Sequence, residues 1–265
     1  MGGSASYRQA RKIREQEERP SGPYSNKYEQ ERLDKAIWTK DKDLVDDTFR
    51  SATGSWWNGL SHEEKKASYD FTGMHYHFMN LALGGAMDPN QIKDETVVRI
   101  NNLTNALDKS AIPTDIWVRR GVSSSHIGRM VGLDKTTSKN KDLVVSEIQK
   151  AIDNDKIFDI KNFMSTGATS DTGFDDSFEM KIFVPKGSKG VYAEPFSAHS
   201  GSHDGMKWDG VTKQSYFGGE FEILLQRGYK LKPIQYNSKG GRNGRNQIVF
   251  TIVGQEAKPY VKPVQ

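Results

Sequence analysis

The 265-residue chain contains no cysteine, so thiol nucleophiles, disulfides and thiolate metal sites are excluded. It also lacks the run of about eighteen apolar residues that a membrane-spanning helix needs. The N-terminal residues carry charge with no apolar stretch behind them, so no cleavable secretory signal is expected. The hydrophobic fraction is 35% and the mean hydropathy is −0.73. We therefore expect a polar, soluble protein that still has enough apolar material for a core.

Positive charge is concentrated near the C-terminus. The formal net charge is only +4, yet residues 227–265 hold eight Lys and Arg residues against a single acid, Glu256. Such an excess suits attraction to a polyanion, or it is an ordinary solvated surface, which is the commoner cause of a charge run.

The spacing of apolar residues divides the chain into regions. Residues 1–27 are rich in Gly, Ser, Arg and Glu, and we expect a mobile extension. Ser61 and Glu64 form a capping-box pattern that predicts a helix start. Apolar periodicity predicts further helices over 74–83, 93–109 and 141–153.

After Pro113 the chain changes to short β-branched and aromatic runs. These predict strands over 116–122, 178–184, 190–193, 221–227, 231–236 and 247–253. Helices first and strands afterwards indicate an α+β fold. We expect a helical lobe over 28–110, a β-rich core over 111–254 and a tail over 255–265.

Two short motifs in the β-rich half suit ligand binding. Arg119 and Arg120 precede Gly121 at a predicted strand end, where guanidinium groups suit phosphate and glycine allows close approach of a ligand. Ser165 and Thr166 follow an apolar pair, and a serine there can orient a carboxylate or a ribose hydroxyl. Each motif alone is weak evidence of function.

A third motif, over residues 216–225, contains two acids. Glu220 and Glu222 stand two residues apart at the start of a predicted strand, so we expect their side chains on one side, with Cα atoms roughly 6.6 Å apart. The apolar run after Glu222 predicts a buried strand. Two carboxylates this close are costly without a task or a cationic partner, so this motif is the strongest candidate for a catalytic site.

Taken in this order, the three motifs resemble those of the bacterial mono-ADP-ribosyltransferase exotoxins of the arginine, serine, glutamate class, and more closely the bacteriophage-encoded members. Residues 60–76 and the Pro-Lys-Gly turn at 185–187 match as well. The resemblance covers about residues 56–253. It implies a split β-sandwich of two packed sheets with an N-terminal helical lobe, with NAD in the cleft between the sheets and no metal.

The resemblance implies a role for each matching residue. Glu222 is expected to be the catalytic glutamate, Ser165 to hydrogen-bond it, and Glu220 to face an arginine acceptor. Arg120, with Arg119 as second choice, is expected to brace the phosphate of the cofactor. The other implied contacts are Gly121 with the nicotinamide amide, Thr166 as second residue of the Ser-Thr-Ser motif, Phe178 stacked on nicotinamide, Lys181 near the pyrophosphate and Phe217 against the acceptor. Gly167 departs from the third serine of that motif.

The resemblance thus implies transfer of ADP-ribose from NAD to arginine on a target protein, by a monomer that acts in the cytoplasm of the target cell without membrane contact. Two alternatives stay open. In the first, nucleic acid or water is the acceptor, which the basic C-terminal excess motivates. In the second, the chain is a non-catalytic NAD-binding virion or adaptor protein, which the N-terminal extension suits, although the intact Glu220, Glu222 and Ser165 argue against it.

Overall fold

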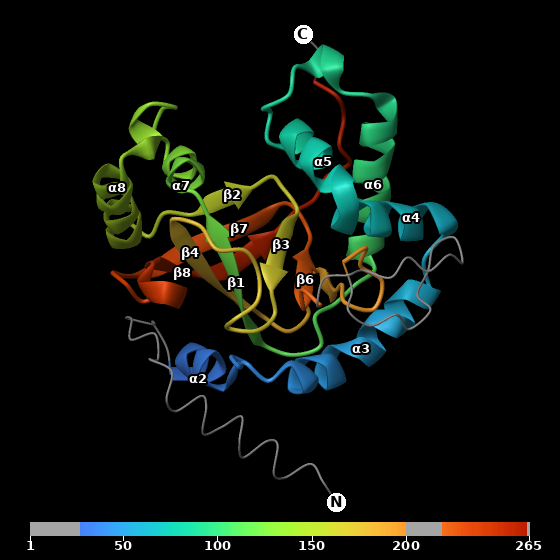
Figure 1. Cartoon of the computed structure of the whole chain (residues 1–265), viewed down its shortest axis with the longest axis horizontal. Helices are drawn as coiled ribbons and strands as arrows, with labels where there is room; N and C mark the ends of the chain where they lie inside the picture. The colour runs from blue at the N-terminus through green and yellow to red at the C-terminus, as the bar shows by residue number, and fades with distance from the viewer. Residues whose placement is uncertain (1–26, 200–218, 264–265) are drawn as a thin grey trace, which may run out of the picture.

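Helices dominate the first part of the chain and strands the second. The computed structural model describes residues 27–199 and 219–263. In this part the helices before the first strand are α2 (Lys27–Lys35), α3 (Lys42–Asn58), α4 (His62–Asp70), the π-helical turn η1 (Phe71–His75), α5 (Tyr76–Leu83) and α6 (Asp94–Asp108). The order expected from the sequence is therefore found (Figure 1).

Helix α4 begins as the sequence predicts. The Ser61 hydroxyl accepts from the Glu64 N–H at 3.2 Å, while the Glu64 carboxylate accepts from the Ser61 N–H at 2.8 Å. Helix α3 was not expected, although Asp41 caps it by accepting from the Leu44 N–H. Its buried residues recur at helical spacing (Val45, Phe49, Thr53, Trp56 and Trp57) and none of them is charged, so the sequence analysis missed an amphipathic pattern that is present.

The strands form one hydrogen-bonded mixed sheet, in the order β2-β7-β8-β4-β1-β3-β6-β5. Their bounds are β1 (Ile116–Val122), β2 (Phe158–Ile160), β3 (Met164–Gly167), β4 (Phe178–Val184), β5 (Gly190–Tyr192), β6 (Glu222–Leu225), β7 (Tyr229–Asn237) and β8 (Asn246–Gln255). Helices α7 (Ser124–Met130) and α8 (Lys141–Asp153) are inserted after β1. The sequence predicts β1, β4 and α8 at these same bounds, but it misses α7 and the three-residue β2.

The sheet has two parts that meet at a single register position. Strand β1 pairs with β3 only at Arg119 opposite Gly167, while it pairs with β4 along its whole length. The ladder β3-β6-β5 therefore continues the larger ladder β2-β7-β8-β4-β1 through one narrow junction. This confirms the α+β fold class, and it places the Arg-Gly and Ser-Thr motifs side by side at the junction.

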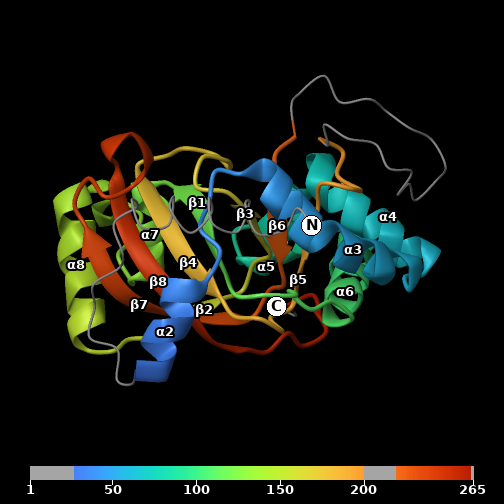
Figure 2. The same cartoon turned by 90° about the horizontal axis from the view of Figure 1, so that it is seen from below.

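The two faces of the larger ladder are covered by different helices. Val118, Met180 and Ile182 face the main core, to which α8 contributes Val144 and Ile148. Trp117, Phe183 and Val249 on β1, β4 and β8 face the other way and pack with Leu33 of α2 and with Ala36, which follows that helix. Alternation along the strand therefore separates an α8 face from an α2 face, and Figure 2 shows α2 lying across the sheet.

The residues after β8 return to the helical part of the chain. Tyr260 accepts from Asn101 through its carbonyl and donates to the Asn101 side chain through its N–H, and its hydroxyl donates to the Ala82 carbonyl. Residues 256–263 thus lie against α5 and α6. In the part of the chain that is described, no helix is long and apolar enough to cross a membrane.

Candidate active site

Glu222 is the first residue of β6 and one of the most deeply buried carboxylates in the structure. It is 5% exposed, and the next three residues of the strand are fully buried. It lies opposite Gly167 of β3, close to the junction of the two ladders. β6 lies between two neighbouring strands, so Glu222 at its start is buried together with the apolar residues that follow it.

The sequence predicts a strand over 221–227, whereas β6 begins one residue later, at Glu222, so neither Phe221 nor Glu220 belongs to it. Phe221 has a φ of +47°, in the left-handed region that a bulky residue rarely adopts. Its N–H donates to Glu194 Oε2 at 3.2 Å, and its carbonyl accepts from the Ala168 N–H at 2.8 Å. Strand alternation stops at this turn, so the rule that predicted Glu220 and Glu222 on one side does not apply here.

The surroundings of Glu222 change its acidity. Burial raises the pKa of Glu222 to about 7, and the hydrogen bond from the Ser165 hydroxyl opposes that rise. The charges of Glu220 and Glu194 raise this pKa further, while Arg120 lowers it. Burial also raises the pKa of the half-buried Glu220, which His199 opposes and Glu194 reinforces. Three acids and one guanidinium therefore act on one another at this site.

The Ser-Thr motif lies on β3, which pairs with β6. Ser165 pairs with Leu224, and the hydroxyl of Thr166 donates to the Ile223 carbonyl at 2.7 Å. Thr166 thus ties β3 to β6. At Gly167 an added Cβ would lie 2.4 Å from the carbonyl oxygen of Thr172. This close approach explains why glycine stands where the toxin motif has a serine.

The two arginines of β1 have separate environments. Arg120 donates to the Ser165 carbonyl at 3.2 Å. Its pKa is lowered by burial, and the charge of Glu222 partly opposes this. Arg120 therefore belongs to the site of Glu222.

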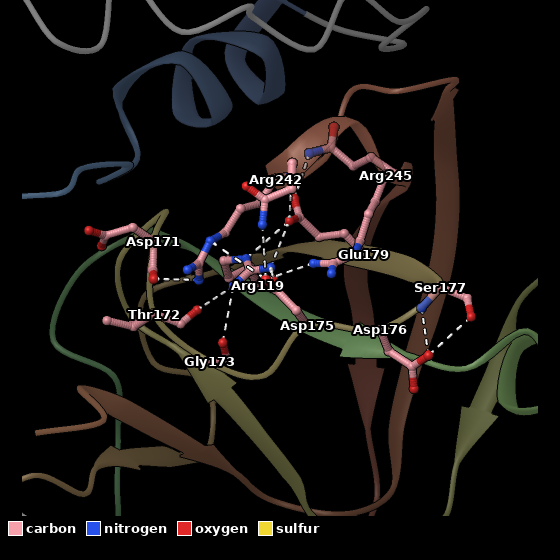
Figure 3. Close-up of polar contacts among 12 residues, drawn as sticks. Arg119, Asp171, Thr172, Gly173, Asp175, Asp176, Ser177, Glu179, Arg242 and Arg245 are labelled. Carbon is pink, nitrogen blue, oxygen red and sulfur yellow. Dashed lines mark hydrogen bonds and ion pairs between the residues drawn. The ribbon is translucent and has the colours of Figure 1, made fainter. Parts of the chain in front are cut away.

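Arg119 is fully buried in a different network (Figure 3). Its guanidinium donates to Glu179 at 3.0 Å, Asp175 at 2.8 Å and the Thr172 carbonyl at 2.6 Å. These contacts hold residues 172–175 of the β3–β4 loop against the sheet. Arg119 is therefore occupied by the protein itself.

The β3–β4 loop also covers Gly121. The Gly121 N–H donates to the Phe174 carbonyl at 3.1 Å, and an added Cβ at Gly121 would lie 2.2 Å from that oxygen. Only glycine fits under this loop. The N–H that the resemblance assigns to nicotinamide is thus engaged by Phe174 here.

Three further residues, Phe178, Lys181 and Phe217, are predicted from the resemblance to contact NAD or the acceptor. Phe178 is fully buried in the main core, where it packs with other apolar side chains. Lys181 faces α2, with its Nζ 4.0 Å from the ring centroid of Trp38. Both assignments depended on the residue spacing after Ser165, which does not determine the path of the β3–β4 loop. Phe217 lies outside the described residues.

Three further residues belong with this region, and the sequence analysis missed them. Glu194 is 3% exposed and supports the turn at Phe221. Asn80 of α5 donates to the Phe163 carbonyl at 3.4 Å, and its Oδ1 is buried with no hydrogen-bond partner among the described residues. The ring of Phe174, in the loop over Gly121, is 75% exposed. No local motif marks any of them, although Asn80 and Glu194 are polar residues in otherwise apolar stretches.

Metal-binding groups are not found in this part of the molecule. No cluster of three or more His, Asp or Glu side chains suitable for a metal ion occurs among the residues that the structure describes.

Comparisons with solved structures show that other proteins share this fold. Solved structures with a similar fold include C3stau2 from S. aureus with NAD, at 18% identity and a TM-score of 0.63, covering 83% of this chain and 99% of that one. Plx2a, an ADP-ribosyltransferase toxin from Paenibacillus larvae, matches at 18% identity and a TM-score of 0.60, over 83% and 99% of the two chains. The ADP-ribosylating toxin BECa of C. perfringens, solved with NADH, matches at 22% and 0.58, over 80% of this chain and 48% of its own.

The sequence comparisons point to the same group. No curated protein sequence matches the chain. The family model described as "ADP-ribosyltransferase exoenzyme", however, matches residues 47–255, which include most of α3 and every element from α4 to β8. The chain therefore belongs to the ADP-ribosyltransferase exoenzyme family.

Proposed function

We propose that this protein transfers ADP-ribose from NAD to arginine side chains of a target protein and releases nicotinamide. The observation that carries the proposal is the buried carboxylate of Glu222, hydrogen-bonded by Ser165 and flanked by Glu220 and Arg120. Family membership supports the transferase activity, and C3stau2 and BECa were solved with NAD and NADH. Family membership does not specify the acceptor, and arginine is our proposal.

Glu222 suits the stabilisation of positive charge on a ribose. When the bond to nicotinamide breaks, positive charge develops on the ribose carbon, and a fixed carboxylate in a site shielded from water stabilises it. Because the pKa of Glu222 is about 7, the carboxylate is ionised in roughly half of the molecules at neutral pH. A cationic nicotinamide ring nearby favours the ionised form further.

The neighbouring groups suit the other parts of NAD. Ser165 holds the Glu222 carboxylate in one orientation through its hydrogen bond. Arg120 provides a guanidinium for a phosphate on the same side of the sheet. The buried Oδ1 of Asn80 offers an acceptor to a donor of the dinucleotide. In this proposal the Phe174 segment moves away from Gly121 so that nicotinamide reaches the strand.

Glu220 suits the acceptor. It is half-buried, unlike Glu222, so it can contact both the site and an incoming protein. A guanidinium is protonated at neutral pH and is a poor nucleophile. A nearby carboxylate can pair with it, orient it and accept its proton as the new bond forms.

The basic C-terminal region gives less support to a nucleic-acid acceptor than its charge suggests. Lys230 pairs with Asp159, Lys232 with Asp155 and Arg245 with Asp175, each at 2.7 Å. Much of the positive charge between residues 227 and 265 is therefore matched by acids from other parts of the chain.

One experiment tests the acceptor directly. The protein is incubated with labelled NAD and either a mixed protein lysate or total RNA, and mass spectrometry locates the modified group. We expect ADP-ribose on arginine side chains. Label on RNA, or free ADP-ribose alone in every mixture, would contradict arginine transfer, and binding of NAD without any turnover would support the non-catalytic alternative.

The similarity to bacteriophage-encoded members stays a prediction from the sequence.

A further inference from the structure

A cavity lies on the α2 face of the sheet. Its volume is about 880 Å³, within the range of small-molecule sites. Trp38 and Lys40, from the segment between α2 and α3, form one wall, and Arg242 from the β7–β8 turn contributes to another. The floor consists of polar side chains of β4, β7 and β8.

This cavity is separated from Glu222 by the sheet. Glu179 and Lys181 line it, and they pair across β1 with Gly121 and Arg119. Arg120 and its partner Met180 project to the other face, toward the main core. The cavity therefore does not belong to the site built around Arg120 and Glu222.

A chain of hydrogen bonds runs across the cavity floor. Gln235 Nε2 donates to Asn237 Oδ1 at 2.7 Å, and Asn237 Nδ2 donates to Gln247 Oε1 at 2.9 Å. Gln247 Nε2 then donates to Glu179 Oε1 at 2.8 Å. Four side chains on three adjacent strands thus form one hydrogen-bonded chain, in which every amide donates toward Glu179.

The Glu179 carboxylate at the end of this chain fixes the direction in which each amide donates. Glu179 also accepts from Arg119 Nε and from the Arg242 N–H, both at 3.0 Å, so it acts purely as an acceptor. Each amide in the chain must then donate toward Glu179 and accept from the amide before it. The first member, Gln235, is left with an oxygen that no amide of the chain reaches, and its Oε1 is buried with no hydrogen-bond partner among the residues that the structure describes. An orphan acceptor of this kind is costly unless a ligand supplies a donor.

The rim and floor carry more positive than negative charge. Lys40, Lys181 and Arg242 line the cavity, together with Asp171 and Glu179. Glu179 is already bonded to the buried Arg119, which does not line the cavity. The Arg242 guanidinium donates to the Asp171 carbonyl at 2.6 Å, and its Nε lies 3.8 Å from the carboxylate of Asp175, which does not line the cavity. The Ser170 N–H donates to the Thr39 carbonyl, next to Lys40, and Arg242 donates to the Asp171 carbonyl, so Lys40 and Arg242 flank one end of the cavity and favour an anion there.

From these features we propose that the α2-face cavity binds a small phosphate ester of nucleotide size. Its phosphate contacts Lys40 and Arg242, and an N–H or O–H group donates to Gln235 Oε1. Trp38 provides the apolar wall against which the remainder of the ligand packs. The proposal concerns a site apart from the transferase centre and does not rest on the proposed function.

Calorimetric titration of the whole protein with uridine 5′-monophosphate tests the site. We expect 1:1 binding that uridine without the phosphate does not reproduce. Two cavity variants, Lys40→Gln and Gln235→Met, are each expected to weaken binding roughly tenfold, the effect of losing one hydrogen bond or charge contact to the ligand. Lys40 is exposed, so its replacement leaves the fold intact.

Two controls distinguish this cavity from other binding modes. Lys239→Gln changes an exposed lysine in the same turn as Arg242 that does not line the cavity, so it should leave the affinity unchanged. Ser165→Ala, at the transferase centre, should likewise leave it unchanged. Absence of binding, equal binding of uridine, unaltered affinity in both cavity variants, or loss of binding in Ser165→Ala would each overturn the proposal.

Discussion

The main-chain N–H of Phe221 donates to the carboxylate of Glu194 at 3.2 Å, and this bond supports the left-handed residue that separates Glu220 from Glu222. A left-handed conformation at a bulky residue costs roughly 1–3 kcal/mol and persists only where its surroundings hold it. Glu194 supplies such support from the end of β5. Its charge also raises the pKa of both Glu220 and Glu222.

Replacement of Glu194 by Gln is therefore expected to move the pH dependence of catalysis. Gln keeps an acceptor for the Phe221 N–H but removes a negative charge that raises the pKa of Glu222. Because the proposed mechanism requires the ionised Glu222, the acidic limb of the pH–rate profile, expected near pH 7, should shift to lower pH. Glu194→Ala should in addition lower kcat/KM about tenfold, through loss of the turn's support. An unshifted profile in Glu194→Gln would show that Glu194 has no electrostatic effect on the site.

The two acids of the motif are expected to have separable roles. Glu222→Gln should lower both ADP-ribose transfer and NAD hydrolysis by about 10³-fold, because charge stabilisation at the ribose is lost. Glu220→Gln should lower transfer about 10²-fold while hydrolysis stays within a fewfold of the parent. Both rates can be followed with labelled NAD, with and without an arginine-containing acceptor. An equal loss of the two rates in Glu220→Gln would contradict a separate acceptor role.

Glu222 should also make the folded protein less stable at high pH. Its folded pKa of about 7 lies above the ordinary value of 4.5, so the folded protein binds more protons than the unfolded chain between these pH values. Its stability must then fall as pH rises through this window. At pH 8, Glu222→Gln should stabilise the protein by on the order of 3 kcal/mol, or raise Tm by about 5–10 °C. Thermal unfolding at pH 4.5 should show little difference, and the same gain at both pH values would rule out this linkage.

Arg119 is expected to matter for stability because it is the buried partner of Glu179. Arg119→Met removes the donors to Glu179, Asp175 and the β3–β4 loop and should cost about 3–5 kcal/mol in the free energy of unfolding. The double variant Arg119→Met with Glu179→Met should recover part of that loss, because no buried charge is then left unpaired. Urea unfolding of the two single variants and of the double variant measures the coupling. A loss in the double variant equal to the sum of the single losses would contradict it.

Replacing Gly167 with the serine that the toxin motif has at this position is expected to destabilise the protein. A Cβ there would lie 2.4 Å from the Thr172 carbonyl oxygen, so the β3–β4 loop must move to admit Gly167→Ser. We expect a loss of roughly 1–3 kcal/mol in the free energy of unfolding. Thr166→Ser, on the neighbouring position of the same strand, keeps its hydroxyl and is the matched control. A stabilised or more active Gly167→Ser would refute the steric explanation.

Local sequence determined much of the framework of this protein. The capping box at Ser61, the amphipathic period of α8 and the apolar runs of β1 and β4 act over a few residues, so their bounds follow from the sequence alone. The Arg-Gly, Ser-Thr and Glu-x-Glu motifs likewise identified the family, because their order along the chain is a property of the sequence.

The tertiary structure decided what each polar group contacts. Arg119 and Arg120 are adjacent in the sequence, yet alternation along β1 gives one to Glu179 and the other to the site of Glu222. Glu194, Asn80 and the amides on the α2 face acquire partners, or are left without one, only when distant strands and helices meet. Burial and hydrogen-bond direction depend on such long-range contacts, and no short stretch of sequence contains them.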